Sequence, residues 1–205
     1  MSPPIAPPTA GCSPPPFPVR RFTVDEYHRM IQAGILTEND PVELLDGWIT
    51  PKMPQNVPHQ LSIELVPEVL RSVLPIGWRV RAQLPITTAD SEPEPDFAVV
   101  RGPILRHQLA APTPADIGVL IEAADSTLGH DRNVKGPLYA RANIGCYWII
   151  NLVDRQVEVY TDPAGPVATP HYRQRRDFRP GDVVPLVLAG QQVAAIPVND
   201  LLPPP

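Results

Sequence analysis

The chain has 205 residues, enough for one domain with a substantial hydrophobic core but few for two. Its net charge of −5 excludes a protein that coats nucleic acid generally, because such proteins are basic. Its two cysteines, Cys12 and Cys146, exclude a disulfide framework and a cysteine-based zinc site. There is no secretory signal and no apolar run of the ~18 residues that a membrane span needs. We therefore expect a cytoplasmic protein that does not contact the membrane.

The first predicted elements follow a proline-rich start. Eight of the 30 prolines fall within residues 1–18, so we expect residues 1–19 to form a disordered leader and residues 203–205 a short proline tail. Thr23 and Glu26 form a capping box that predicts the start of a helix, and Gly34 predicts its end. The pair Asp46-Gly47, between two apolar runs, predicts a hairpin with a two-residue turn.

The rest of the chain alternates between strand and helix patterns. A helical pattern covers residues 59–74, and Pro67 inside it predicts a kink. Residues 118–124 are almost all apolar, which predicts a strand buried on both faces. Further strands are predicted at residues 78–87, 96–100, 146–152 and 156–161, with weaker ones around 172 and at 183–188, and a short helix near 132–143. This order predicts a single α/β domain, with a central mixed β-sheet flanked by helices.

Three carboxylates occur where the local sequence is apolar. Glu43 interrupts a run of Val and Leu, Asp96 opens an apolar strand, and Glu122 lies deep within residues 119–124. A charge in or beside a buried strand is costly unless it is paired or binds a metal ion. If the strands are neighbours, the three carboxylates converge at one end of the sheet, where their oxygens suit Mg²⁺ or Mn²⁺.

Each candidate residue also has a plain structural interpretation. Glu43 suits a strand edge that faces water, and Asp96 suits the start of a strand. Glu122 suits an ion pair with an arginine or a lysine, because both of its neighbours are apolar. His59 suits a capping or surface position before a helix, and Lys135 suits a solvated helix face. The pattern alone leaves these alternatives open.

Taken together, the motifs resemble those of the Uma2 family (DUF820). In chain order they are Val42-Glu43-Leu44-Leu45-Asp46-Gly47 with Met53-Pro54 and His59; Pro95-Asp96-Phe97-Ala98-Val99-Val100; Ile121-Glu122 with Ser126-Thr127, Asp131-Arg132, Lys135 and Tyr139-Ala140; and Tyr147-Trp148-Ile149-Ile150. Each motif is short, but their order and spacing extend the resemblance from about Arg20 to Leu202.

The resemblance implies a restriction-endonuclease-like domain of the PD-(D/E)XK superfamily over residues 20–202. It implies that Asp96 and Glu122 are metal ligands, that Glu43 is a further acidic member of the metal site, which holds a second ion or a metal-bound water, and that a lysine lies close by. The superfamily's usual lysine position, two residues after the second acid, is occupied here by Ala124. The resemblance therefore assigns the lysine's role to Lys135, on the following helix.

The implied function is that of a metal-dependent endonuclease, which hydrolyses phosphodiester bonds in DNA with Mg²⁺ or Mn²⁺ as cofactor. His59 is expected to contact phosphate or to tune one of the acids. Two alternatives are a catalytically silent module that binds nucleic acid or protein, and a metal hydrolase that acts on a small phosphoester. The silent module is considered because Ala124, and Gly136-Pro137 directly after Lys135, depart from the usual motif.

A homodimer is expected as well. Cleaving both strands of a duplex is easiest for a protein with two active sites, and two-fold dimers are the commonest oligomers. The apolar strands near residues 146–160 are candidates for the interface.

Overall fold

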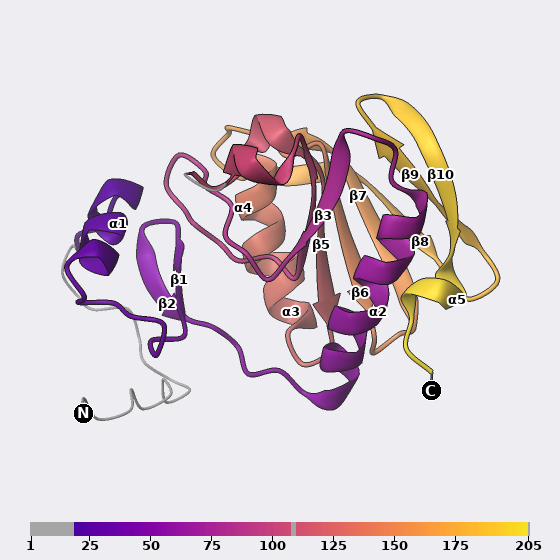
Figure 1. Cartoon of the computed structure of the whole chain (residues 1–205), viewed down its shortest axis with the longest axis horizontal. Coiled ribbons are helices and arrows are strands. Elements are labelled where there is room, and N and C mark those ends of the chain that lie inside the picture. Colours follow the sequence, from indigo (N-terminus) through magenta and orange to yellow (C-terminus); the bar gives the residue numbers. More distant parts are fainter. Residues whose placement is uncertain (1–18, 108–109, 205) are drawn as a thin grey trace.

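A six-stranded mixed sheet forms the centre of the protein (Figure 1). The computed structural model describes residues 19–107 and 110–204, so nearly all of the predicted leader lies outside the described residues. The strands are β3 (Trp78–Ala82), β4 (Phe97–Arg101), β5 (Ile117–Ala124), β6 (Cys146–Asn151), β7 (Gln156–Ala164) and β8 (His171–Phe178), in this spatial order. Strands β5 and β6 are parallel, and every other neighbouring pair is antiparallel. The predicted fold class is confirmed.

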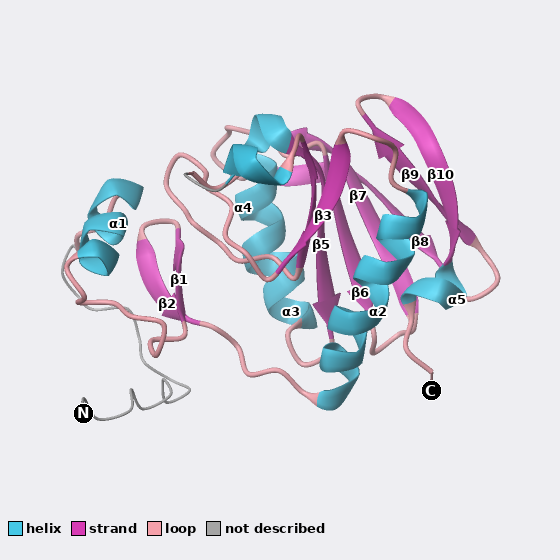
Figure 2. Ribbon diagram, viewed as in Figure 1, coloured by secondary structure: helices cyan, strands magenta, loops and turns pink. Residues whose placement is uncertain are grey.

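Helices and a second hairpin cover the two faces of this sheet (Figure 2). One face carries α2 (Val57–Val73), the hairpin of β9 (Val183–Leu188) and β10 (Gln191–Pro197), and α5 (Val198–Leu201). The other face carries α3 (Leu128–His130), the π-helical turn η3 (Asp131–Lys135) and α4 (Gly136–Arg141). Two short 3₁₀ turns, η1 (Ile104–His107) and η2 (Pro114–Asp116), lie between β4 and β5.

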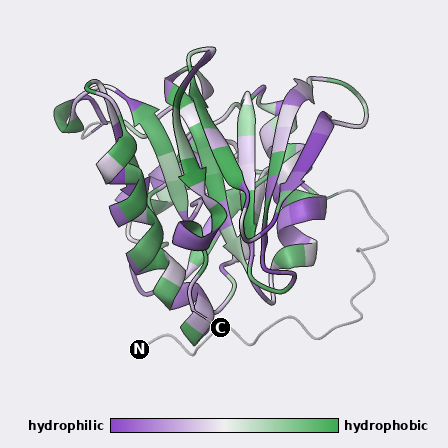
Figure 3. Cartoon of the chain, turned by 90° about the vertical axis from the view of Figure 1, so that its right-hand side faces the viewer, coloured by the Kyte–Doolittle hydropathy of each residue, from purple (hydrophilic) through white to green (hydrophobic). Residues whose placement is uncertain are grey.

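Strand β5 is buried on both faces because its side chains alternate between the two faces of the sheet and both faces are covered. Val119 and Ile121 join the core beneath α2 and the β9–β10 hairpin, whereas Leu120 and Ala124 join the core beneath α4. The central strands of the sheet are accordingly largely hydrophobic in Figure 3. The prediction of a doubly covered strand at residues 118–124 is confirmed, and any charge on it lies in a desolvated setting.

A small N-terminal unit lies beside the sheet, at the left of Figure 1. It contains α1 (Val24–Gln32), β1 (Val42–Leu45) and β2 (Trp48–Pro51), and the predicted capping box is present. The hairpin turns at Asp46 and Gly47, whose φ angles of 52° and 75° suit the predicted two-residue turn. The backbone N–H of Glu92 donates to the carbonyl of Leu44 at 2.7 Å, which ties β1 to the segment that leads into β4.

Three sequence-based expectations need correction. The strand predicted at residues 78–87 ends at Ala82, because Gln83 adopts a φ of 49° and its N–H donates to the carbonyl of Asp96. The helix predicted near 132–143 begins earlier, at Leu128, and contains a π-turn. Strands β6 and β7 lie inside the sheet with both faces covered, so they cannot supply the dimer interface suggested for residues 146–160. Strand β10 and helix α5 were not predicted.

No helix within the described parts of the chain is long and apolar enough to cross a membrane.

Candidate metal and phosphate site

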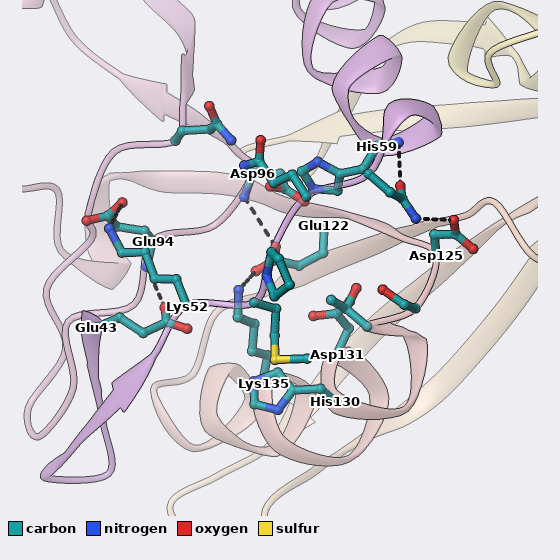
Figure 4. A pocket seen from close by; sticks show the side chains of 17 residues that line it. Glu43, Lys52, His59, Glu94, Asp96, Glu122, Asp125, His130, Asp131 and Lys135 are labelled. Atoms are coloured by element: carbon teal, nitrogen blue, oxygen red, sulfur yellow. Dashed lines mark hydrogen bonds and ion pairs between the residues drawn. The ribbon is translucent and has the colours of Figure 1, made fainter. Parts of the chain in front are cut away.

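The ends of β4 and β5 are joined by reciprocal bonds between two carboxylates and the neighbouring backbone. The N–H of Asp96 donates to Glu122 Oε2 at 3.2 Å, and the N–H of Ala123 donates to Asp96 Oδ2 at 2.8 Å. These bonds hold the two acids side by side at one edge of the sheet, as Figure 4 shows. The predicted convergence of Asp96 and Glu122 is therefore present in the structure.

Glu122 is only 2% exposed and has three donors. Besides the backbone N–H of Asp96, the Lys135 ammonium lies 2.9 Å from Oε1, and the Tyr139 hydroxyl donates to the same oxygen at 2.8 Å. Burial raises the pKa of Glu122 well above its ordinary value, while the charge of Lys135 opposes this rise. The nearby charges of Asp96 and Asp131 raise the pKa of Glu122 further. The site therefore holds more negative charge than Lys135 alone compensates.

Lys135 reaches this site because of the π-turn. The N–H of Gly136 donates to the carbonyl of Asp131, five residues earlier, and this widened turn is followed directly by Pro137. Lys135 is thus at the N-cap of α4, as the proline predicts, and the residue is buried. Burial alone would lower the pKa of Lys135, but the charges of nearby carboxylates, Glu122 first among them, outweigh burial and raise it. The ammonium group remains charged.

Asp131 lies four residues before Lys135 and lines the same cavity. It is 3% exposed, and the Thr127 hydroxyl donates to its Oδ2 at 2.7 Å. Burial raises the pKa of Asp131, and the charge of Lys135 opposes that rise. The sequence analysis had noted Asp131 only as part of a motif. Its four-residue spacing from Lys135 was the available signal, because residues so spaced share a helix face.

Glu43 approaches from the β1–β2 hairpin. Its Oε2 accepts the N–H of Glu94 at 3.0 Å, two residues before Asp96, and the side chain is buried. The Lys52 ammonium lies 2.6 Å from Glu94. The interpretation of Glu43 as a water-facing strand edge is therefore wrong.

His59 lies in the first turn of α2. The backbone N–H of His59 donates to Oδ1 of the N-cap residue, Asn56, at 3.2 Å. Nε2 of the His59 ring lies 2.9 Å from Asp96 Oδ2. Nδ1 of the ring is buried, with no hydrogen-bond partner among the described residues. His59 is thus a neighbour of Asp96 and not a surface residue.

One cavity of about 100 Å³ brings these side chains together. Six carboxylates line it: Glu43, Glu94, Asp96, Glu122, Asp125 and Asp131. The chain contains only two lysines, Lys52 and Lys135, and both line the cavity, so the formal excess is four negative charges with every carboxylate ionised and the histidines neutral. The volume holds a few water molecules, or one ion and part of a phosphate group, but not a whole nucleotide.

The donor set suits a divalent cation. Mg²⁺ is usually held by one or two carboxylates, and it fills its other positions with water and substrate phosphate. Asp96 and Glu122 provide such a pair, next to an uncompensated negative charge that a cation would neutralise. Within residues 19–107 and 110–204 no cluster of three or more His, Cys, Asp or Glu side chains forms a ready-made metal cage. The residues therefore fit an open site of two carboxylates rather than a closed structural one.

The structure is a single α/β domain whose central mixed sheet carries two adjoining carboxylates and a lysine at one end of its strands. A family model, Uma2, described as "Putative restriction endonuclease", matches residues 24–199, and the chain belongs to this family. The fold is also similar to the crystal structure of a putative nuclease belonging to DUF820 from Anabaena variabilis ATCC 29413. The TM-score is 0.63 at 20% identity, covering 88% of this chain and 97% of that chain. No curated protein gave a significant match.

Proposed function

We propose that this protein is a metal-dependent endonuclease that hydrolyses phosphodiester bonds in DNA. The main support is the contact between Asp96 and Glu122, with the Lys135 ammonium 2.9 Å from the same glutamate. Membership of a restriction-endonuclease family agrees with this chemistry. The small cavity supports a substrate that inserts only a phosphate group, as a polymer backbone does.

Asp96 and Glu122 would hold the ion, Mg²⁺ or Mn²⁺, and Glu43 would complete the acidic wall on the hairpin side. When bound, the ion supplies positive charge at the scissile phosphate and favours activation of a water molecule. The hydrogen bonds from Ala123 and from the Asp96 N–H keep the two carboxylates in place before the ion arrives. Such preorganisation means that little reorganisation is needed during the reaction.

Lys135 would orient the attacking water or stabilise charge that develops on the phosphate. Its ammonium is fixed by Glu122 and stays protonated, so it can donate hydrogen bonds but cannot act as a general base. Position 124 holds an alanine in place of the usual lysine, but Lys135, which follows the π-turn, places its ammonium group next to the same acid, Glu122. His59 would position Asp96 through their 2.9 Å contact.

The test combines calorimetry with Mg²⁺ or Mn²⁺ and cleavage of a supercoiled plasmid. We expect both ion binding and cleavage in the wild-type protein, and loss of both in Asp96→Asn. The Glu68→Gln variant is a matched control that should keep both, because Glu68 is exposed on α2 and does not line the cavity. Ion binding without cleavage would favour hydrolysis of a small phosphoester, and neither activity would favour a silent binding module.

A further inference from the structure

A second cavity, of about 530 Å³, lies at the opposite end of the central strands. It opens to solvent between the β9–β10 hairpin and the sheet, and none of its sixteen lining residues lines the acidic cavity. Ile117 and Gly118, which begin β5, form part of its floor, whereas Glu122 lies near the other end of the same strand. The two cavities are therefore separate sites.

Gly118 shapes the wall of this second cavity. A Cβ added there would lie 2.5 Å from a methyl group of Leu188 and 2.7 Å from the ring of Trp78. Leu188 closes the turn of the hairpin and is buried. Because Gly118 has no side chain, Trp78 and the hairpin can approach β5 directly. Trp78 and Phe178 form the aromatic wall of the cavity.

The charge of the second cavity is opposite to that of the first. Arg101 and Arg176 line it, and its lining contains neither aspartate nor glutamate. Among the described residues, no carboxylate lies within 4.0 Å of either guanidinium group, although the chain as a whole has a net charge of −5. Two arginines without acidic partners in a pocket favour an anionic ligand.

Aromatic rings hold both arginines in place. The Arg101 guanidinium carbon lies 4.9 Å from the centre of the Trp78 ring, and that of Arg176 lies 5.2 Å from the centre of the Phe178 ring. Stacking on a ring restricts a guanidinium group without using its N–H donors. The donors therefore stay available to a bound group.

The rest of the lining is mostly apolar, with Ile117, Val159 and Val187 as the larger side chains. The volume is within the range of sites for small organic ligands. We propose that this cavity binds a small organic anion with an apolar body, of the medium-chain carboxylate type. Its carboxylate would accept hydrogen bonds from Arg101 and Arg176, and its hydrocarbon part would lie against Val187 and the aromatic wall.

Calorimetry with octanoate, in the absence of DNA and divalent ions, tests this proposal independently of any nuclease activity. Octan-1-ol and acetate are the matched probes, since the first lacks the charge and the second lacks the apolar body. We expect octanoate to bind at least about tenfold more tightly than either probe. Against octan-1-ol, this is the typical contribution of a hydrogen bond to a charged group. Against acetate, the difference comes from the apolar body. The indole N–H resonance of Trp78 should shift on binding, and that of Trp48, which does not line the cavity, should not.

Variants of the full chain locate the anion. Arg101→Gln and Arg176→Gln should each weaken octanoate binding about tenfold, whereas Arg173→Gln should not. Arg173 lies on the same strand as Arg176 and is equally exposed, but it pairs with Asp162 and lies outside the cavity. Val187→Trp, at a position 40% exposed on β9, should fill the space and abolish binding.

Equal binding of octanoate and octan-1-ol, or unchanged affinity in both Arg101→Gln and Arg176→Gln, would overturn the proposal. Tighter binding of thymidine monophosphate than of octanoate would replace the aliphatic carboxylate by a nucleotide. If Val187→Trp fails to fold, the two glutamine variants still decide the question, because both arginines are on the surface.

Discussion

The buried ion pair between Lys135 and Glu122 gives a quantitative prediction about stability. Their side chains are 10% and 3% exposed, and the two charged atoms are 2.9 Å apart. Removing one member of such a pair typically costs about 3–5 kcal/mol, because the other charge stays buried without compensation. We expect Lys135→Met to lower the free energy of unfolding by an amount near the bottom of that range, since Glu122 keeps its hydrogen bond from the Tyr139 hydroxyl.

The loss should depend on pH. Without Lys135, burial and the charge of Asp96 act unopposed and raise the pKa of Glu122 further. A group whose pKa is higher in the folded state than in the unfolded state stabilises the fold at low pH, and this contribution is lost as the pH rises. The deficit of Lys135→Met should therefore shrink as the pH falls from neutral toward 4.5, the ordinary pKa of a glutamate.

The assay is urea unfolding of the wild type, Lys135→Met, Glu122→Gln and the double variant. The double variant should cost about 1–3 kcal/mol less than the sum of the single variants, because removing both partners leaves no uncompensated charge. Lys52→Met is the control, since Lys52 is 33% exposed in its pair with Glu94 and such pairs contribute about 0–1 kcal/mol. Additive effects, or a cost for Lys135→Met no larger than that of the control, would refute the reasoning.

Three further predictions concern other parts of the chain. Asp96→Asn should abolish Mn²⁺ binding in calorimetry. It should leave the melting temperature of the ion-free protein equal or higher, because it relieves the repulsion between Asp96 and Glu122. If the variant unfolds instead, Asp96 is a structural residue. Burial raises the pKa of Glu158, but hydrogen bonds, first that from Arg132, outweigh burial and lower it to about 2. Glu158 therefore stabilises the fold above about pH 4.5, and this contribution is lost as the pH falls toward 2. In urea unfolding, Glu158→Gln should lack this dependence of the free energy of unfolding on pH, whereas the exposed control Glu68→Gln should keep it. Light scattering at micromolar concentration should give the mass of a dimer, and a monomer mass would contradict the assembly expected here.

Local sequence signals explain which parts of the fold were predictable. The capping box at Thr23, the turn at Asp46-Gly47 and the apolar run of β5 each involve residues close in sequence, and all three are present. The early end of β3 at Ala82 depends on a contact between Gln83 and Asp96, thirteen residues later, which no local pattern shows. The same limit applies to the π-turn, because the carbonyl of Asp131 that accepts its hydrogen bond also accepts the hydroxyl of Tyr147, sixteen residues later.

The candidate site was predictable where a charge disagreed with its surroundings. Glu122 was the clearest case: it pairs with a lysine, as its structural interpretation expected, and it lies beside Asp96, as the predicted convergence of carboxylates required, while its role as a metal ligand stays a prediction. Lys135 looked like a solvated lysine, and only the family resemblance directed it to Glu122. Tyr139 was missed as a donor to Glu122, because the pattern of a helix predicts only that a tyrosine packs in the core. Its hydroxyl contacts a residue seventeen positions away, which no local pattern shows.

Single-turnover cleavage by Lys135→Ala, measured beside DNA binding, tests the proposed nuclease site most directly. Cleavage of a labelled duplex is followed with saturating Mn²⁺, and binding is titrated in Ca²⁺ with the same duplex. We expect a cleavage rate lower by on the order of 10²-fold or more, with DNA affinity changed far less, because Lys135 acts mainly in the transition state. Equal losses in both assays would reduce Lys135 to a phosphate contact, and no loss in either would contradict its place in the reaction.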